Sequence, residues 1–181
     1  MKKLTFAFLV ALGASLLVAL GASLFVSCGP KLDTPEDLGE SMLDAFSAQD
    51  KEALAELFMT KEEMISLIEE ESKTEMDEAR KSGVERVKTD FIERGDEKIS
   101  KEINESFEDI NEKAKRKSIN WDEVEFVRLE SKQDNWIFKS VKCKVFFKTE
   151  SLTDLFLVFN ASQIFGEWKI IGMEGGIGGF K

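Results

Sequence analysis

The chain lacks two residue types on which much enzyme chemistry depends. Its 181 residues include no histidine and no tyrosine. Nucleophilic triads built on histidine and zinc sites built on imidazole are therefore excluded. What remains is a large set of carboxylates, 35 Asp and Glu against 25 Lys and Arg, together with two cysteines. Acid–base catalysis by carboxylates, metal binding by oxygen ligands and thiol chemistry are left to consider.

Three acidic residues fall on or beside predicted strands: Glu125, Glu130 and Asp154. A carboxylate becomes a useful acid or base when it is buried, but the pattern favours a solvated position for each of the three. The acids between Asp90 and Glu97 lack the Asp-x-Asp-x-Asp-Gly order of a calcium loop. The sequence therefore predicts no catalytic residue, no metal site and no cofactor site.

The two cysteines differ in their surroundings. Cys143 lies in an alternating run in which Val141, Val145 and Phe147 share its side, so it is predicted to point into the core. A buried cysteine packs as a small apolar residue, and here no histidine is present to lower its pKa. After modification of the other cysteine, Cys28, no intramolecular disulfide can form.

Cys28 follows a long uncharged stretch at the start of the chain. Lysines at positions 2 and 3 precede a run from Leu4 to Ser27 without a charged residue, which is the arrangement of a secretory signal. The run is long enough to span a bilayer, so a permanent transmembrane anchor is the alternative. It contains the heptapeptide Val-Ala-Leu-Gly-Ala-Ser-Leu twice, at positions 10 and 18, which indicates duplication of a shorter signal core.

The segment Leu24-Phe25-Val26-Ser27-Cys28-Gly29 resembles the lipobox of bacterial lipoproteins. The resemblance implies a diacylglyceryl thioether on the sulfur of Cys28 and cleavage by a peptidase that requires a small residue, here Ser27, before the cut. Acyl chains on the new N-terminus would then hold the protein on a membrane of the bacterial cell envelope. Gly29 stands where an aspartate retains lipoproteins at the inner membrane of enteric bacteria, which favours the outer membrane.

Beyond the signal peptide at 1–27, a tether at 28–34 leads to a single domain at 35–181. The whole chain carries a net charge of −10, and this acidity excludes nucleic acid as an expected partner. Most of the excess acid falls before residue 120, on the predicted helices. A solvated face is the usual meaning of such charge, and a cation-binding or partner-docking role is the alternative.

Helical spacing dominates residues 35–118. A Thr-Pro-Glu-Asp start at position 34 predicts a first helix over about 35–48, and a second is expected over 51–58. Thr60 and Glu63 form a capping box for a third. From 69 to 118 two sparse apolar stripes predict a pair of long, half-exposed helices with a turn at Gly95-Asp96, packed on the same chain in preference to a coiled-coil partner.

The apolar period changes to two after Trp121, which predicts an antiparallel sheet over 121–173. The expected strands lie at about 122–131, 135–149, 152–162 and 167–173. The expected turns lie at 132–135, 149–151 and 165–167. Residues 174–181, which include the glycine run Gly175–Gly179, are predicted to form a flexible tail because no helix follows that could hold a phosphate. The predicted fold class is α+β, with N-terminal helices and a long helical insertion packed on a four-stranded antiparallel sheet.

The Pro-Glu-Asp-Leu helix start, the second helix and the closing Gly-Glu-Trp-Lys-Ile-Ile-Gly strand resemble the nuclear transport factor 2-like group of cystatin-like α+β proteins. The matching stretches are 34–58 and 152–173. The resemblance implies a cone-like sheet around a helix with a pocket at its open end, with Gly166 at a turn and Trp168 covering one end of the core. Enzymes of the group use a tyrosine donor, which this chain lacks. Residues 61–118 exceed what that fold needs.

These observations favour a non-catalytic lipid-anchored envelope protein that binds a small molecule or another envelope protein. One alternative is a carboxylate-based hydrolase or isomerase of the same fold. Another is a structural or immunity-type protein that acts through its acidic helical insertion. The state of the pocket distinguishes the three. An open pocket with a buried carboxylate would favour the enzyme, and an open apolar pocket without one would favour the binding protein. A pocket filled by Phe and Met side chains would favour the structural or immunity-type protein.

Overall fold

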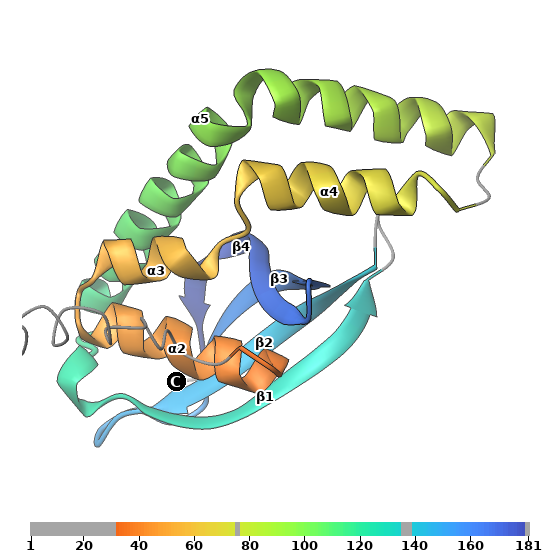
Figure 1. The fold of residues 1–181 in the computed structure, drawn as a ribbon. Helices are drawn as coiled ribbons and strands as arrows, with labels where there is room; N and C mark the ends of the chain where they lie inside the picture. Colours follow the sequence, from red (N-terminus) through yellow and green to blue (C-terminus); the bar gives the residue numbers. More distant parts are fainter. Residues whose placement is uncertain (1–31, 75–76, 135–138, 180–181) are drawn as a thin grey trace, which may run out of the picture. The chain divides into compact units, whose positions relative to one another are not determined.

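The computed structural model describes residues 32–74, 77–134 and 139–179. Within them the chain forms four α-helices, one 3-10 turn and a four-stranded antiparallel sheet (Figure 1). The predicted α+β fold class is confirmed. The segment that ends at Ser27 and the cysteine at position 28 lie outside the described residues, so the signal peptide and the lipid anchor remain predictions.

Capping side chains set the starts of the first three helices. These helices are α2 (Pro35–Ser47), α3 (Lys51–Leu57) and α4 (Lys61–Glu71). Before α2, the Thr34 hydroxyl accepts a hydrogen bond from the Asp37 amide at 3.1 Å, and the Asp37 carboxylate accepts one from the Thr34 amide at 2.9 Å. The predicted capping box of Thr60 and Glu63 is also present. Both boxes satisfy amides that a first helical turn leaves unpaired, which explains why these starts were predictable.

The long helix α5 (Glu78–Arg116) is continuous over 39 residues, so the predicted turn at Gly95-Asp96 was wrong. Figure 1 shows a bend between a first half that lies along α4 and a second half that lies along the sheet. Gly95 is buried against the stem of Lys61, and a Cβ there would lie 2.8 Å from the Lys61 Cγ. A glycine inside a helix costs only about 1 kcal/mol relative to alanine, so packing on both halves keeps the helix intact and the glycine permits a bend.

The sheet is an open meander in which the strands pair in sequence order. The strands are β1 (Glu125–Asp134), β2 (Ser140–Lys148), β3 (Leu155–Ile164) and β4 (Glu167–Gly178). A 3-10 turn at 121–123, capped by Asn120, delays the start of β1 from the predicted residue 122. The predicted turn at 132–135 was wrong, because Lys132 and Asp134 still pair with β2. These polar residues lie on an exposed edge, where a strand needs no apolar alternation.

The C-terminal glycines belong to the sheet, so the predicted flexible tail from residue 174 was wrong over 174–178. Gly178 lies opposite Phe156 in the β3–β4 ladder, and a Cβ on it would overlap the Phe156 ring. A Cβ on Gly175 would lie 2.7 Å from Oδ2 of Asp109 in α5. The glycines thus allow β3 and α5 to approach the last strand closely. The turns predicted near residues 150 and 166 are confirmed.

The main hydrophobic core lies between one face of the sheet and the helices α2, α3 and α5. The predicted inward face of β2 is confirmed, since Cys143 and Phe147 are fully buried. A row of aromatic rings crosses this core. Phe147 stacks on Trp121 at 6.0 Å, Trp121 on Phe46 at 5.3 Å and Phe46 on Phe107 at 5.6 Å between ring centroids. Such pairs stabilise a core by about 0.5–1.5 kcal/mol each beyond the burial of their area.

A second, smaller core joins α4 to the first half of α5 and to the end of β3. Its buried residues are Met59, Met64, Leu67, Ile68, Val84 and Ile164. We call residues 61–71 and 78–95 the arm. Two ion pairs link its helices at the surface, Lys88 with Glu69 at 2.9 Å and Arg80 with Glu71 at 3.3 Å. The apolar stripe of this segment therefore packs on its own chain, as predicted.

Candidate functional site

The interior of the sheet, where the family resemblance implies a pocket, is filled with side chains. Phe46, Phe147, Phe159 and Met42 are fully buried there. Trp168 packs against the rim of this core, as expected for a residue that covers one end of it. A ligand would therefore have to bind at the surface and not inside the sheet.

None of the three acidic residues considered for catalysis lies in apolar surroundings. Glu125 forms an ion pair with Lys148 at 2.7 Å, and Glu130 forms one with Arg128 at 3.1 Å; both carboxylates are more than half exposed. Asp154 is exposed just before β3. All three are solvated, as the sequence favoured, and a general acid or base of raised pKa requires a drier position.

Cys143 lies in the main core and is fully buried. Burial raises the pKa of its thiol to about 12, with a further contribution from the negative charge of Glu36. The thiol is therefore protonated at neutral pH and has neither the exposure nor the charge of a nucleophilic cysteine. Its role is packing, as predicted from the strand pattern.

The acidic stretch from Asp90 to Glu97 is helical, and three of its four acids form ion pairs. Asp90 pairs with Lys98, and Arg94 lies 3.3 Å from Glu97. A helix distributes successive side chains around its circumference, so this stretch does not form the loop that binds calcium. Within the described ranges no three Cys, Asp or Glu side chains gather closely enough to hold a metal ion.

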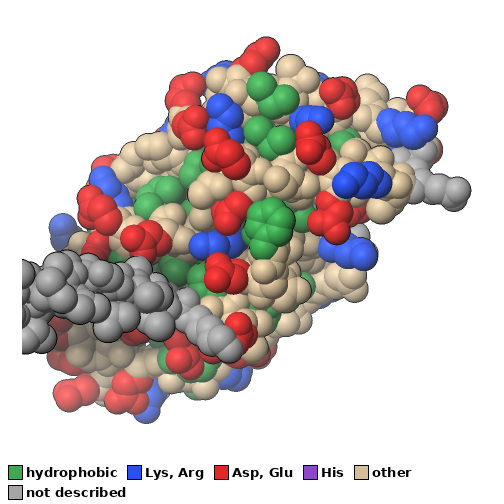
Figure 2. All heavy atoms as spheres, in the orientation of Figure 1, with side chains coloured by type: hydrophobic (Ala, Val, Ile, Leu, Met, Phe, Trp, Pro, Cys, Tyr) green, Lys and Arg blue, Asp and Glu red, His purple; other side chains and the backbone are tan. Residues whose placement is uncertain are grey.

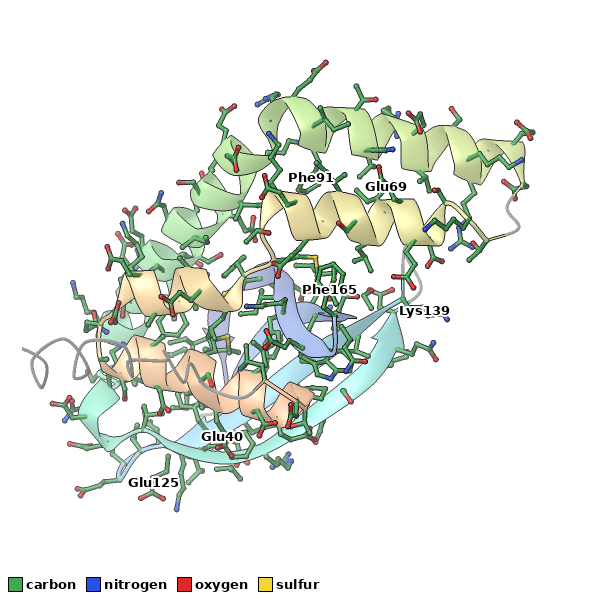
Figure 3. The ribbon with its side chains drawn as sticks, in the orientation of Figure 1. Glu40, Glu69, Phe91, Glu125, Lys139 and Phe165 are labelled. Atoms are coloured by element: carbon green, nitrogen blue, oxygen red, sulfur yellow. The ribbon has the colours of Figure 1, made fainter. Side chains whose placement is uncertain are left out.

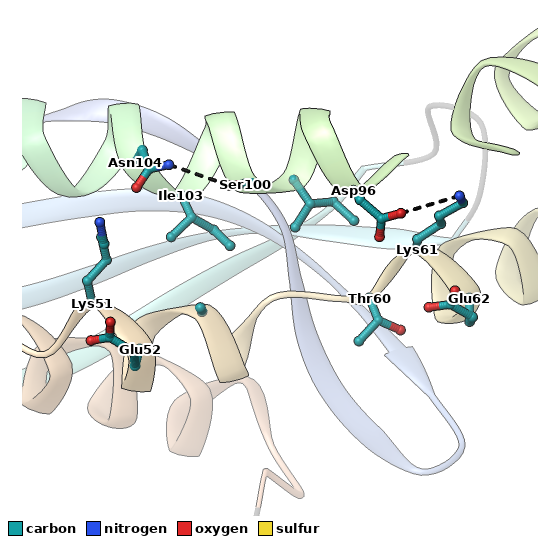
Figure 4. A pocket seen from close by; sticks show the side chains of 11 residues that line it. Lys51, Glu52, Thr60, Lys61, Glu62, Asp96, Ser100, Ile103 and Asn104 are labelled. Carbon is teal, nitrogen blue, oxygen red and sulfur yellow. Dashed lines mark hydrogen bonds and ion pairs between the residues drawn. The ribbon is translucent and has the colours of Figure 1, made fainter. Parts of the chain in front are cut away.

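A cleft of about 600 Å³ separates α3 and the start of α4 from the second half of α5 (Figure 4). Lys61 spans it to Asp96 at 3.4 Å, and Lys51 and Glu52 also line it. Its one serine, Ser100, accepts a hydrogen bond from a neighbouring asparagine and has no base beside it. Charges of both signs line the cleft, and among its described lining residues no nucleophile lies beside a base.

A second groove, of about 490 Å³, lies between α4 and the adjoining ends of the strands. We call it the α4 groove. Leu67 and Trp168 contribute apolar surface to it, and Glu70 and Glu71 contribute negative charge. Glu71 is held by an arginine of α5, whereas Glu70 forms no ion pair with the part of the chain that the structure describes. Lys139 also lines the groove, so its rim carries charges of both signs, with the acids on α4 and the lysine on the strand side.

Phe165 projects from the turn between β3 and β4, below α4 in Figure 3. Its side chain is 84% exposed, more than the other exposed large apolar residues, Ile92 and Val127. In the same orientation, Figure 2 shows apolar surface at that place with acidic and basic side chains around it. Gln163 and Trp168, which flank the turn, both line the α4 groove. Sequence analysis placed Phe165 in a turn but missed it as a site, because exposure of one phenylalanine leaves no periodic signal.

Comparison with protein families, with curated proteins and with solved structures found no match. The resemblance to the nuclear transport factor 2-like group thus rests on its own residues and remains an expectation. Across the described residues, no helix is both long enough and apolar enough to cross a bilayer.

Proposed function

We propose that this chain is an exported bacterial lipoprotein, held on the cell envelope by lipid on Cys28, that binds another envelope protein. The binding face is formed by α4 and the β3–β4 turn. Attachment to the membrane is supported by the lipobox-like sequence around Ser27 and Cys28. The binding function is supported above all by the exposure of Phe165.

Phe165 is unfavourable for the isolated fold on two grounds. It exposes a large apolar side chain, and it adopts a φ of 52° beside Gly166 at 92°. Turns of two residues with positive φ suit asparagine and glycine, whereas other residues lose about 1–2 kcal/mol in the left-handed conformation. Residues with a strained backbone are concentrated at functional sites, and aromatic side chains are common anchors of protein interfaces.

The surroundings of Phe165 indicate what kind of partner fits. The α4 groove begins beside the turn, and its Leu67 and Trp168 offer a wall for an apolar side chain. On the α4 side of that wall Glu70 contributes negative charge, since Glu71 is paired with Arg80, and on the strand side Lys139 contributes positive charge. A protein segment that carries an apolar residue with a lysine or arginine on the side that faces α4 matches this combination in shape and in charge.

The filled interior weighs against the enzyme and the small-molecule carrier, and it favours a protein that acts through its helical insertion, to which α4 belongs. A carboxylate-based hydrolase or isomerase requires a desolvated acid, and the acids considered for that role are solvated. A small-molecule carrier of the cone-like kind requires an internal cavity, and that space is occupied by aromatic side chains. Binding through the α4 face requires neither feature.

The proposal can be tested with a photo-reactive amino acid at position 165 of the full-length chain in living bacteria. A matched control carries the same amino acid at Glu150, which is exposed in the β2–β3 turn at the opposite end of the sheet. We expect one protein adduct of defined mass from position 165, none of that mass from position 150, and less of it when Glu70→Lys is added. Equal adducts at both positions, or none at position 165, would contradict a protein-binding role.

A further inference from the structure

The two edges of the sheet differ in how their backbone groups are used. At β4, the Trp168 amide donates to the Leu32 carbonyl and the Met59 amide donates to the Ile170 carbonyl, both at 2.9 Å, and a carboxylate of α5 accepts from a third amide. At β1, no described residue outside the β1–β2 ladder offers a backbone hydrogen bond. Figure 1 shows β1 along the margin of the sheet. The edge of β1 is therefore open to a further strand.

The outer face of β1 carries charges that alternate in sign. Arg128, Glu130, Lys132 and Asp134 lie on this face, in that order, and all four are exposed. Arg128 is fixed by the Phe146 ring, 3.8 Å from its guanidinium carbon, and by Glu130 at 3.1 Å. Lys132 and Asp134 form no ion pair with the described residues. Their charges are available to a partner.

This order of charges is complementary to itself when the strand is reversed. In an antiparallel pair centred on Ser131, Arg128 faces Asp134 of a second copy and Glu130 faces Lys132, and symmetry repeats both pairs. Opposite charges directly across two strands stabilise their pairing. We propose that the chain associates with a second copy of itself through its β1 edge in this register. The charged residues of this pairing lie outside α4 and the β3–β4 turn, and the surface adjoins the α4 groove only at Gln133. The inference rests on the order of charges along β1 and not on the proposed partner site.

The neighbouring registers bring like charges together. A pair centred on Glu130 sets Arg128 against Lys132 and Glu130 against itself. A pair centred on Lys132 sets Glu130 against Asp134 and Lys132 against itself. Charged side chains on an edge strand usually discourage pairing. On β1 they discourage the registers on either side and favour the one centred on Ser131.

The shape of β1 agrees with this register. A bulge at Val127 interrupts the β1–β2 ladder between Phe126 and Arg128, and the strand is regular from 128 to 134. Ser131 is the middle residue of that regular stretch, so the complementary register uses all of it. Val127 is 45% exposed at its end and adds apolar surface that a second copy can cover. A second copy fits this edge better than an unrelated strand because the charges match their own order reversed.

Cross-linking of introduced cysteines tests the register. The parent for this test is the full-length chain with Cys143→Ala, because Cys143 lies directly opposite residue 131 in the β1–β2 ladder and would compete for an introduced thiol. In this parent, Ser131→Cys places two thiols about 4.5–5.5 Å apart across the axis, close to disulfide distance, whereas Gln133→Cys places them roughly four residue steps, about 13 Å, apart. Under mild oxidation we expect a dimer joined through position 131 and at least tenfold less through position 133, with the parent chain as background. Equal cross-linking at both positions, or none at position 131, would overturn the proposal.

Charge reversal tests the pairing itself. Lys132→Glu and Glu130→Lys each place like charges opposite one another at two symmetry-related positions of the pair. Each variant alone should therefore dimerise with a dissociation constant at least about tenfold higher than the parent, as measured by sedimentation equilibrium of the full-length chain. Mixing the two variants restores opposite charges at both positions, and association should recover. Lys81→Glu on α5 is the control for net charge, and it should leave association unchanged. A mixture no stronger than either variant alone would contradict the β1 interface.

Discussion

Phe165 occupies a turn position that suits asparagine better, because its φ is 52°. Phe165→Asn should therefore raise the free energy of unfolding by about 1 kcal/mol while it weakens binding of the proposed partner. Urea denaturation of the full-length chain measures the first effect. Gly166→Ala, at a φ of 92°, is the control and should lower stability. A Phe165→Asn protein less stable than the parent would show that the aromatic ring stabilises the fold itself.

Phe147 and Cys143 share the buried face of β2, but replacing each with alanine should affect stability to a different extent. Phe147 is fully buried and stacks on Trp121, so Phe147→Ala should cost about 3–5 kcal/mol of unfolding free energy. Cys143→Ala removes only a small buried group and should leave any binding function intact. Denaturant titration and the cross-linking yield at position 165 measure the two effects. Loss of function in a normally folded Cys143→Ala protein would overturn its assignment to packing.

The arm shows how tertiary packing can override a local signal. The pair Gly95-Asp96 has the composition of a turn, yet α5 continues through it because both halves of the helix are packed, one on α4 and the other on β4. Gly83 is also inside α5 but has no neighbour within 4 Å of a Cβ position. The same residue type thus marks a close approach at position 95 and open space at position 83. Sequence alone does not separate the two.

The link between α4 and α5 should depend on pH. Lys88 lowers the pKa of the Glu69 carboxyl below its usual value of 4.5, first by a hydrogen bond and then by its charge. A carboxyl whose pKa is lower in the folded state stabilises that state above the unfolded value, and the contribution disappears as pH falls through the folded value. The arm should therefore loosen below about pH 4.5, with a modest effect because both groups are solvent-accessible.

Amide hydrogen exchange measures this loosening. Residues 78–91 should exchange faster than 141–147 at neutral pH, because fewer buried apolar contacts hold the arm. After correction for intrinsic rates, the difference should widen at about pH 3.5 in the parent and less so in Glu69→Gln. Equal protection of the arm and of β2 would contradict this account of the arm as the less stable element.

The parts of the fold that could be predicted are those governed by local chemistry. Helix caps at Thr34 and Thr60 and the alternation along β2 were sufficient for the α+β fold class and for the orientation of Cys143. The final strand was too short in the prediction because its end depends on glycines that are needed for close approach. Gly178 pairs with Phe156 at a distance that leaves no room for a Cβ, and Gly175, in the bulge before it, lies against Asp109 of α5. That requirement depends on residues far away in the sequence.

The candidate site was less accessible to prediction than the fold. The expected pocket inside the sheet is filled because Phe46, Trp121 and Phe147 stack across it. Trp121 was placed at the boundary between helix and strand, and its contact with α2 depends on a 3-10 turn that no periodic pattern indicates. The turn at Phe165 was predicted, but the exposure of its ring and the open edge of β1 emerge only once the strands are paired.

The most direct test of the account at the scale of the whole molecule is the mass of the mature N-terminus, since the proposed lipid on Cys28 would decide where the protein works. If the sulfur of Cys28 carries the lipid, intact-mass analysis of membrane-extracted protein should give an acylated chain that begins at Cys28. Cys28→Ala should abolish labelling by a fatty-acid analogue and leave the precursor uncut. Fractionation alone is insufficient, because an uncleaved apolar segment would also keep the chain on a membrane. A mature chain that begins at Met1, or one with an unmodified Cys28, would contradict the proposed lipoprotein.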